Sequence, residues 1–166
     1  QDIARLSAGF GLCADAAMAS LGSALKKREM LSARLGDVLS NLYLASMVLK
    51  QWHTGNQVEG EEALLHYSLR FLLNRAEQAF VEIFDNLPNR ALGKTLKVVV
   101  MPTGRRWNKP HDDLARDIAQ RVSTHSALRS KLLSNTWDKD DGAVSNPLAR
   151  YNALLGDYDR AESIYR

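Results

Sequence analysis

Apolar side chains recur at spacings of three and four residues over most of this chain, a pattern that predicts helices that bury one face. The first such segment runs from about Ile3 to Arg28, with apolar positions at Ile3, Leu6, Phe10, Ala14, Ala17, Leu21 and Leu25. Another face of the same segment carries mostly small residues, namely Ala8, Gly11, Asp15, Ala19 and Gly22. Because small side chains let a neighbouring helix approach closely, we expect a helix contact on that face.

The second segment has the most regular pattern in the chain. Its apolar residues alternate at spacings of four and three, at Leu31, Leu35, Val38, Leu42, Ala45, Leu49 and Trp52. The run LYLASMVL, from Leu42 to Leu49, adds further apolar residues on a different face. Since this half of the helix is apolar nearly all round, it needs more than one neighbour, and part of its surface is expected to meet another domain. Polar residues and glycines between Thr54 and Gly60 predict a loop.

Two more helices follow before the pattern weakens. From Glu61 to Asn86 the apolar pattern returns at Leu65, Leu69, Leu72, Ala76, Ala79, Ile83 and Leu87, and Pro88 stops the helix. A shorter helix is predicted from Arg90 to Met101, ending at Pro102. Beyond Pro110 the pattern favours short helices that begin near Asp112, after Ser126 and at Pro147, the last of them interrupted at Gly156.

These elements predict an all-α protein. The fold would be an up-down bundle of three long antiparallel helices plus a shorter fourth, because short links place consecutive helices side by side in opposite directions. We expect one helical domain over residues 1–166, with a core bundle at about 3–101 and short helices at about 110–166 wrapping it at the C-terminal end. The chain starts at Gln1, without a methionine and inside a helical pattern, so it is expected to be a fragment of a larger chain.

Composition and charge limit the classes of function that this protein can have. Apolar residues make up 45% and charged residues 25% of the chain, as in an ordinary globular protein. The 22 basic and 19 acidic residues leave a formal charge of +3, too even a balance to indicate a nucleic-acid partner. Cys13 has no second cysteine to pair with and is expected to be a buried, inert thiol. The segment Leu6 to Leu25 is long enough to span a membrane, but its small residues and the charge of Asp15 argue against that.

Motifs for chemistry are few. The histidines fall in separate segments without HExxH spacing, so no metal site is expected. Neither a GxSxG elbow nor a glycine-rich phosphate loop is found, and Gly9 and Gly11 lie inside a helix. We therefore assign no catalytic residue within this chain.

Asp15 and Asp37 are carboxylates within apolar stretches. Burial raises the pKa of a carboxylate and can turn it into a general base. The alternative, which we favour, is that each forms a buried ion pair or hydrogen bond across the bundle, for example with Arg34 or Lys50. Such a pair would set the register of the helices and take no part in chemistry.

The basic segment that follows the Pro-Thr-Gly turn contains candidates for substrate binding. The guanidinium groups of Arg105 and Arg106 could bind a phosphate, and the indole of Trp107 could stack on a planar ring. A solvated basic loop, or a contact to a part of the protein outside this chain, is the interpretation we prefer.

Three segments resemble one known family. The residues KKREMLSARLGDVLSNLYLASMVLK, from Lys26 to Lys50, resemble the C-terminal domain of the large bacterial-type fatty-acid acyl-coenzyme A dehydrogenases. SAGFGLCADAAMASLG upstream resembles the entry helix of the same family, and NLPNRALGKTLKVVVMPTGR, from Asn86 to Arg105, resembles its stretch ending in a Pro-Thr-Gly-Arg turn. From Trp107 onward the similarity is looser.

The resemblance implies an FAD-dependent enzyme that oxidises fatty acyl-CoA to trans-2-enoyl-CoA in β-oxidation, in the bacterial cytoplasm or at the inner face of the inner membrane. The family places its catalytic glutamate and most FAD contacts in preceding domains, so the expected partners are the catalytic core domains of the same chain. The full-length enzyme would also bind its substrate, fatty acyl-CoA, and an electron-transfer partner. A homo-oligomer is possible under this hypothesis. Under this hypothesis the domain itself serves packing and assembly. The alternative is a free-standing, non-enzymatic bundle that binds an acyl chain or a partner helix.

Overall fold

The computed structural model describes residues 1–124, 126–134, 136 and 147–165, and every regular element among them is helical. The chain forms two compact units, which are described separately. The first contains Gln1–Gly55 and Leu65–Pro110, and the second contains Asn56–Leu64 and His111–Arg166. The predicted core bundle therefore falls mostly in the first unit and the predicted short helices in the second.

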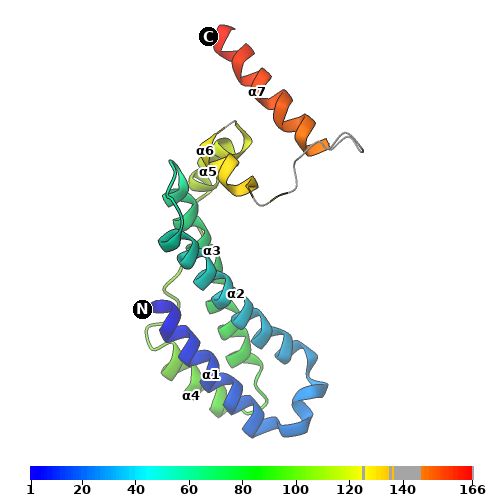
Figure 1. Ribbon diagram of the computed structural model, residues 1–166. Helices are drawn as coiled ribbons and strands as arrows, with labels where there is room; N and C mark the ends of the chain where they lie inside the picture. Colours follow the sequence, from blue (N-terminus) through cyan, green and yellow to red (C-terminus); the bar gives the residue numbers. More distant parts are fainter. Residues whose placement is uncertain (125, 135, 137–146, 166) are drawn as a thin grey trace. The chain divides into compact units, whose positions relative to one another are not determined.

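The first unit is built from long helices that run up and down beside one another. Helix α1 spans Asp2–Leu21, α2 spans Glu29–Thr54, α3 spans Glu61–Asn86 and α4 spans Arg90–Val100. Figure 1 shows α1 and α2 running in opposite directions, with α4 beside α1. The all-helical bundle that the periodicity predicts is confirmed, and the predicted bounds of α3 are those observed.

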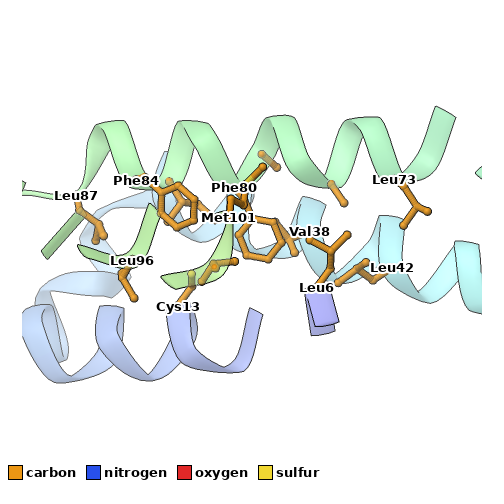
Figure 2. Packing of buried hydrophobic residues seen from close by; sticks show 14 of the residues in the cluster. Leu6, Cys13, Val38, Leu42, Leu73, Phe80, Phe84, Leu87, Leu96 and Met101 are labelled. Atoms are coloured by element: carbon orange, nitrogen blue, oxygen red, sulfur yellow. The ribbon is translucent and has the colours of Figure 1, made fainter. Parts of the chain in front are cut away.

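The core of this unit lies between α1, α2, α3 and α4. Figure 2 shows side chains from all four helices meeting there, among them Leu6, Val38, Phe80 and Leu96. Phe80 is completely buried and stacks against Phe84, with ring centroids 5.9 Å apart. Full burial of one large apolar side chain contributes about 1.5–3 kcal/mol, so this apolar cluster is the main source of stability of the unit.

The first helix is shorter than predicted. It ends at Leu21, and the chain continues to Lys27 as a 3-10 helix, η1, spanning Gly22–Lys27. Gly22 has φ of 50° and ψ of −127°, a conformation that side chains with a Cβ avoid. The apolar residues Leu21 and Leu25 both pack against the core. Their spacing therefore suggested a continuous α-helix, while the glycine between them ends it.

The close helix contact on α1 is made by a different glycine from the one expected. A Cβ added to Gly9 would lie 2.5 Å from Cγ1 of Val100 on α4, whereas a Cβ on Gly11 would meet nothing within 4 Å. Of the small-residue face predicted for contact, Ala8, Asp15 and Ala19 are exposed. Gly9 is therefore the position at which α1 needs the absence of a side chain.

The described residues of the second unit form three further helices. They are α5, Asp112–Ser123; α6, Ala127–Leu133; and α7, Pro147–Tyr165. The Ser126 hydroxyl accepts a hydrogen bond from the amide of Arg129 at 3.1 Å and caps α6, as the sequence predicts. The expected interruption of the last helix is wrong, because α7 continues through Gly156. Wrapping of the bundle by these helices stays a prediction.

Asp2–Lys27 is long and apolar enough, by length and composition alone, to cross a membrane. Within its most apolar window 17% of the residues are buried in the structure.

Candidate functional site

A buried carboxylate on α3 holds the segment that follows α4. The side chain of Glu77 is 0% exposed, and its Oε2 accepts hydrogen bonds from two consecutive amides, that of Arg106 at 2.9 Å and that of Trp107 at 3.0 Å. Asn74, one turn earlier on α3, donates from Nδ2 to the carbonyl oxygen of Trp107 at 2.7 Å. These hydrogen bonds thus hold the backbone of residues 106 and 107 against α3. Hydrogen bonds to an ionised acceptor are about twice as strong as neutral ones.

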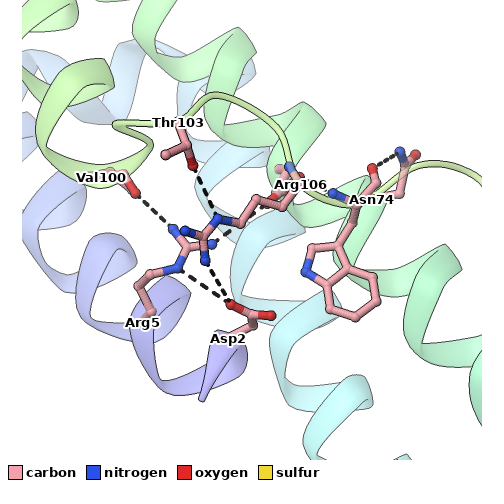
Figure 3. A network of polar contacts seen from close by, with 8 residues as sticks. Asp2, Arg5, Asn74, Val100, Thr103 and Arg106 are labelled. Atoms are coloured by element: carbon pink, nitrogen blue, oxygen red, sulfur yellow. Dashed lines mark hydrogen bonds and ion pairs between the residues drawn. The ribbon is translucent and has the colours of Figure 1, made fainter.

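Arg5 on α1 supplies the opposite charge. Its Nη1 donates to the carbonyl oxygen of Val100 at 3.0 Å, and its Nη2 lies 3.8 Å from Oε1 of Glu77. Figure 3 shows the Arg5 guanidinium beside the carboxylate of Asp2. The distance from Nε of Arg5 to Oδ1 of Asp2 is 3.7 Å. The buried charge of Glu77 is therefore balanced by a side chain from the first turn of α1, which ties α1, α3 and the end of α4 together.

Four buried polar atoms in this cluster make no hydrogen bond within the described residues. They are Nε and Nη2 of Arg5, Oε1 of Glu77 and Nε1 of Trp107. A buried polar atom without a hydrogen-bond partner costs about 1–3 kcal/mol. The cluster therefore depends on its ion pairs and on the two amide bonds to Glu77 Oε2.

The three predicted substrate-binding residues belong to this arrangement. Nη1 of Arg105 donates to Oε1 of Gln78 at 2.8 Å. Nε of Arg106 donates to the Thr103 hydroxyl at 3.1 Å, and its Nη1 lies 3.6 Å from Asp2. The ring of Trp107 packs against the hydrophobic core. The structure brings the three residues together and gives each a partner within the chain, and substrate binding by them stays a prediction.

Glu77 was missed by the sequence reasoning, although a signal was available. The predicted apolar row of α3 ran through Ala76, Ala79 and Ile83. The structure buries a second row as well, made of Leu73, Phe80 and Phe84, and Glu77 occupies the one polar position in it. A lone acidic residue within an apolar row at spacings of four and three is the pattern that would have indicated it.

The buried pair predicted from Asp15, Asp37 and Arg34 is not formed. Asp15 and Asp37 are both exposed, since each lies on the outer face of its helix. Nε of Arg34 instead donates to Oε2 of Glu82 on α3 at 3.2 Å. The hydrogen bond from Gln78 and that from Arg34 together lower the pKa of Glu82. Arg34 does link two helices, but its partner is on α3.

Asp37 and Glu82 line a small polar pocket in the first unit. Its volume is about 190 Å³, and the other lining residues are Asn41, Asn74, Arg75, Gln78, Ala79 and Lys109. The lining contains two carboxylates and two cations, so it has no excess of either charge. A second pocket of about 430 Å³ has a more basic lining that includes Lys27, Arg28 and Arg34.

Cys13 is fully buried on α1, and burial raises the pKa of its thiol to about 12, so it is a packing residue as predicted. Among the described residues no group of three or more His, Cys, Asp or Glu side chains is arranged to hold a metal ion.

The second unit has its own ion pair, between the start of α3 and α6. Nζ of Lys131 lies 2.5 Å from Oε1 of Glu61 and also donates to the carbonyl oxygen of Asn56. Oε2 of Glu61 accepts from the amide of Val58 at 3.0 Å. Burial alone would raise the pKa of Glu61, but the hydrogen bonds from Lys131 and Val58 outweigh it and lower that pKa. The ion pair therefore holds the loop that precedes α3 against α6.

In both units, buried charged side chains of the described residues hold helices and turns in place. The chain matches the family model described as acyl-CoA dehydrogenase, C-terminal, bacterial type, over residues 1–166. It therefore belongs to this family, as the resemblance over most of Ser7 to Arg106 suggested. No solved structure matches the chain.

Proposed function

We propose that this chain is the C-terminal helical domain of an FAD-dependent enzyme that oxidises fatty acyl-CoA to trans-2-enoyl-CoA in β-oxidation, and that its own role is packing and assembly. The observation that carries the proposal is the family match, which extends over residues 1–166. The proposed location is the bacterial cytoplasm or the inner face of the inner membrane. The other proposed participants are an electron-transfer partner and the catalytic core domains of the same chain.

The contacts of the buried charges support a structural role. Glu77 is the most deeply buried acidic residue of the described part, and one of its oxygens already accepts two backbone amides. A general base needs a free oxygen within reach of the substrate proton, about 2.6–3.2 Å away. The side chain of Glu77 is 0% exposed and lies beside Arg5, which supports a structural role for this residue over a catalytic one.

Among the described residues, the two glycines at the start of the chain do not form a phosphate-binding turn for a flavin. Gly9 and Gly11 both lie within α1, and Gly9 packs against Val100, so neither can form a turn that cradles a pyrophosphate. We therefore place FAD in the preceding domains of the parent enzyme and derive no chemical step within this chain.

The proposal is tested by comparing this chain with the full-length enzyme. Both are purified and assayed for bound flavin and for reduction of an artificial electron acceptor with palmitoyl-CoA. We expect turnover from the full-length enzyme and neither flavin nor turnover from residues 1–166 alone. Turnover by this chain alone would show that the active site lies within it. A full-length protein that binds acyl-CoA without oxidising it would contradict the proposed reaction.

A further inference from the structure

Helix α2 carries two rows of exposed side chains, one of large and one of small residues. Leu39, Tyr43 and Met47 follow one another at every fourth residue and are 53%, 62% and 40% exposed, and we call them the large row. Three exposed residues at the same spacing in the first half of the helix form the small row: Ser32, Gly36 and Ser40. The core lies on the opposite side of α2, where Val38 and Leu42 are buried (Figure 2). A row of large apolar side chains in solvent is typical of an interface.

Gly36, in the middle of the small row, has no partner that requires a glycine. A Cβ added to it would meet nothing within 4 Å in the described part of the chain, and its φ is not positive. Gly9 differs, because its missing side chain makes room for Val100. Glycine within a helix is less favourable than alanine. An exposed glycine at this point is explained if a second surface packs closely against it.

The charged residues of α2 leave the two rows free and lie at the ends of this face. Between Glu29 and Lys50 the sequence contains two charged residues, Arg34 and Asp37. Arg34 donates to Glu82 on α3, and Asp37 lines the small polar pocket together with residues of α3. The exposed face therefore has a negative charge at Glu29, a positive charge at Lys50 and uncharged rows between them.

A two-fold axis between residues 39 and 40 would exchange the two rows. In an antiparallel pair of α2 helices related by this axis, the large row of each copy faces the small row of the other. The facing pairs are Tyr43 with Gly36, Met47 with Ser32, and Leu39 with Ser40. Rows at every fourth residue that pack into matching grooves are the commonest form of helix packing. The same pairing sets Glu29 of each copy opposite Lys50 of the other.

We propose that this face of α2 is the contact between two copies of this chain, which pair antiparallel in the full-length enzyme. The proposal rests on the assembly role proposed above and names a second copy as the partner. A closed two-fold contact uses the same patch on both copies, so the patch must be complementary to itself. The face of α2 meets this requirement in shape, through its two rows, and in charge, through Glu29 and Lys50. Neither a lipid surface nor an unrelated protein requires such a match within one face.

Cysteine substitution in the full-length enzyme tests the contact and its direction. Position 40 lies beside the axis, so Ser40→Cys should form a disulfide-linked dimer under mild oxidation. Position 50 lies about 16 Å from the axis along the helix, so two copies of Lys50→Cys are about 32 Å apart and should form no disulfide. A mixture of the Glu29→Cys and Lys50→Cys enzymes, after exchange of subunits, should form a disulfide between the two variants. The unsubstituted enzyme gives the background.

The outcomes that contradict the proposal are distinct. No disulfide dimer from Ser40→Cys would overturn it, and labelling with a small maleimide then identifies the reason. Rapid labelling of position 40 would show a free surface, and protection would show that another part of the same enzyme covers it. A dimer from Lys50→Cys alone would exclude the antiparallel pairing.

Filling the small row provides a second test with a matched control. Gly36→Leu places a side chain where Tyr43 of the other copy packs, so in the Ser40→Cys background it should lower the yield of disulfide dimer by about tenfold. Gly11→Leu is the control, because a Cβ at Gly11 also meets nothing within 4 Å, and it should leave the yield unchanged. Thermal unfolding verifies that both variants fold. Equal yields from the two variants would overturn the proposal. Neither readout requires catalysis, so a failed dehydrogenase assay with the dimer present would contradict the proposed reaction alone.

Discussion

Nη2 of Arg5 and Oε1 of Glu77 lie 3.8 Å apart, the arginine on α1 and the fully buried glutamate on α3. The sequence separates them widely, and the bundle brings them together beneath the turn after α4. Glu77 also accepts the amides of Arg106 and Trp107. One side chain thus links three elements, and its removal affects all of them.

Replacing Glu77 with alanine should destabilise the protein strongly. The substitution leaves Arg5 without its buried partner and two amides without an acceptor, and breaking a buried pair on one side costs about 3–5 kcal/mol. Glu77→Gln should cost less, because its amide oxygen can still accept from the backbone. Chemical denaturation measures both, with Gln78→Ala as an exposed control on the same helix. A loss below about 1 kcal/mol for Glu77→Ala would contradict this role.

Gly9→Ala and Gly11→Ala should have opposite effects. The new methyl group at position 9 would lie 2.5 Å from Val100, and forcing a methyl into a packed contact costs about 1–3 kcal/mol. At position 11 nothing lies within 4 Å, so alanine should stabilise the helix by up to about 1 kcal/mol. Thermal unfolding of the two variants provides the comparison. Adding Val100→Ala to Gly9→Ala should restore part of the loss, and equal effects of the two single changes would refute the assignment.

The ion pair between Glu61 and Lys131 should make stability depend on pH. The hydrogen bonds from Lys131 and Val58 lower the pKa of Glu61 in the folded state below its ordinary value, so folding favours the ionised form. This contribution is fully present above the unfolded pKa and is lost as pH falls through the lower, folded pKa. Lys131→Met should cost about 1–3 kcal/mol at neutral pH, because a hydrogen bond to a charged group is lost.

The test of this pair compares unfolding free energies of the parent chain and Lys131→Met at neutral pH and below pH 4.5. The difference between the two proteins should shrink in acid. The matched control is Arg116→Met, since Arg116 pairs with Asp113 but its side chain is 77% exposed. That change should have little effect at either pH, and a pH-independent cost of Lys131→Met would exclude the proposed linkage.

The thiol of Cys13 should be unreactive in the folded protein. Burial raises its pKa to about 12, so almost none of it is thiolate at pH 8, and the side chain is 0% exposed. A disulfide reagent should label it only after unfolding in denaturant. Rapid labelling of the native protein would show that the contact between α1 and the core opens readily.

Most of the fold could be predicted from local patterns. The apolar rows of α2 and α3 gave the correct helices because a helix buries one face, and that requirement leaves a period in the sequence. The end of α1 was missed because Leu21 and Leu25 keep the helical spacing across Gly22, where the backbone adopts a positive φ. Periodicity reports which side chains are buried and does not report the backbone conformation between them.

The candidate site was only partly predictable. The sequence alone indicates that Arg105, Arg106 and Trp107 form a basic segment after a turn, and that the run around Leu42 to Leu49 has more apolar surface than one neighbour can cover. Tertiary structure decided that Glu77 holds this segment and that Arg34 pairs with Glu82 instead of an aspartate. The physical reason is that a charged residue finds its partner by the register between helices. That register depends on how side chains interlock across the whole core, which no single segment encodes.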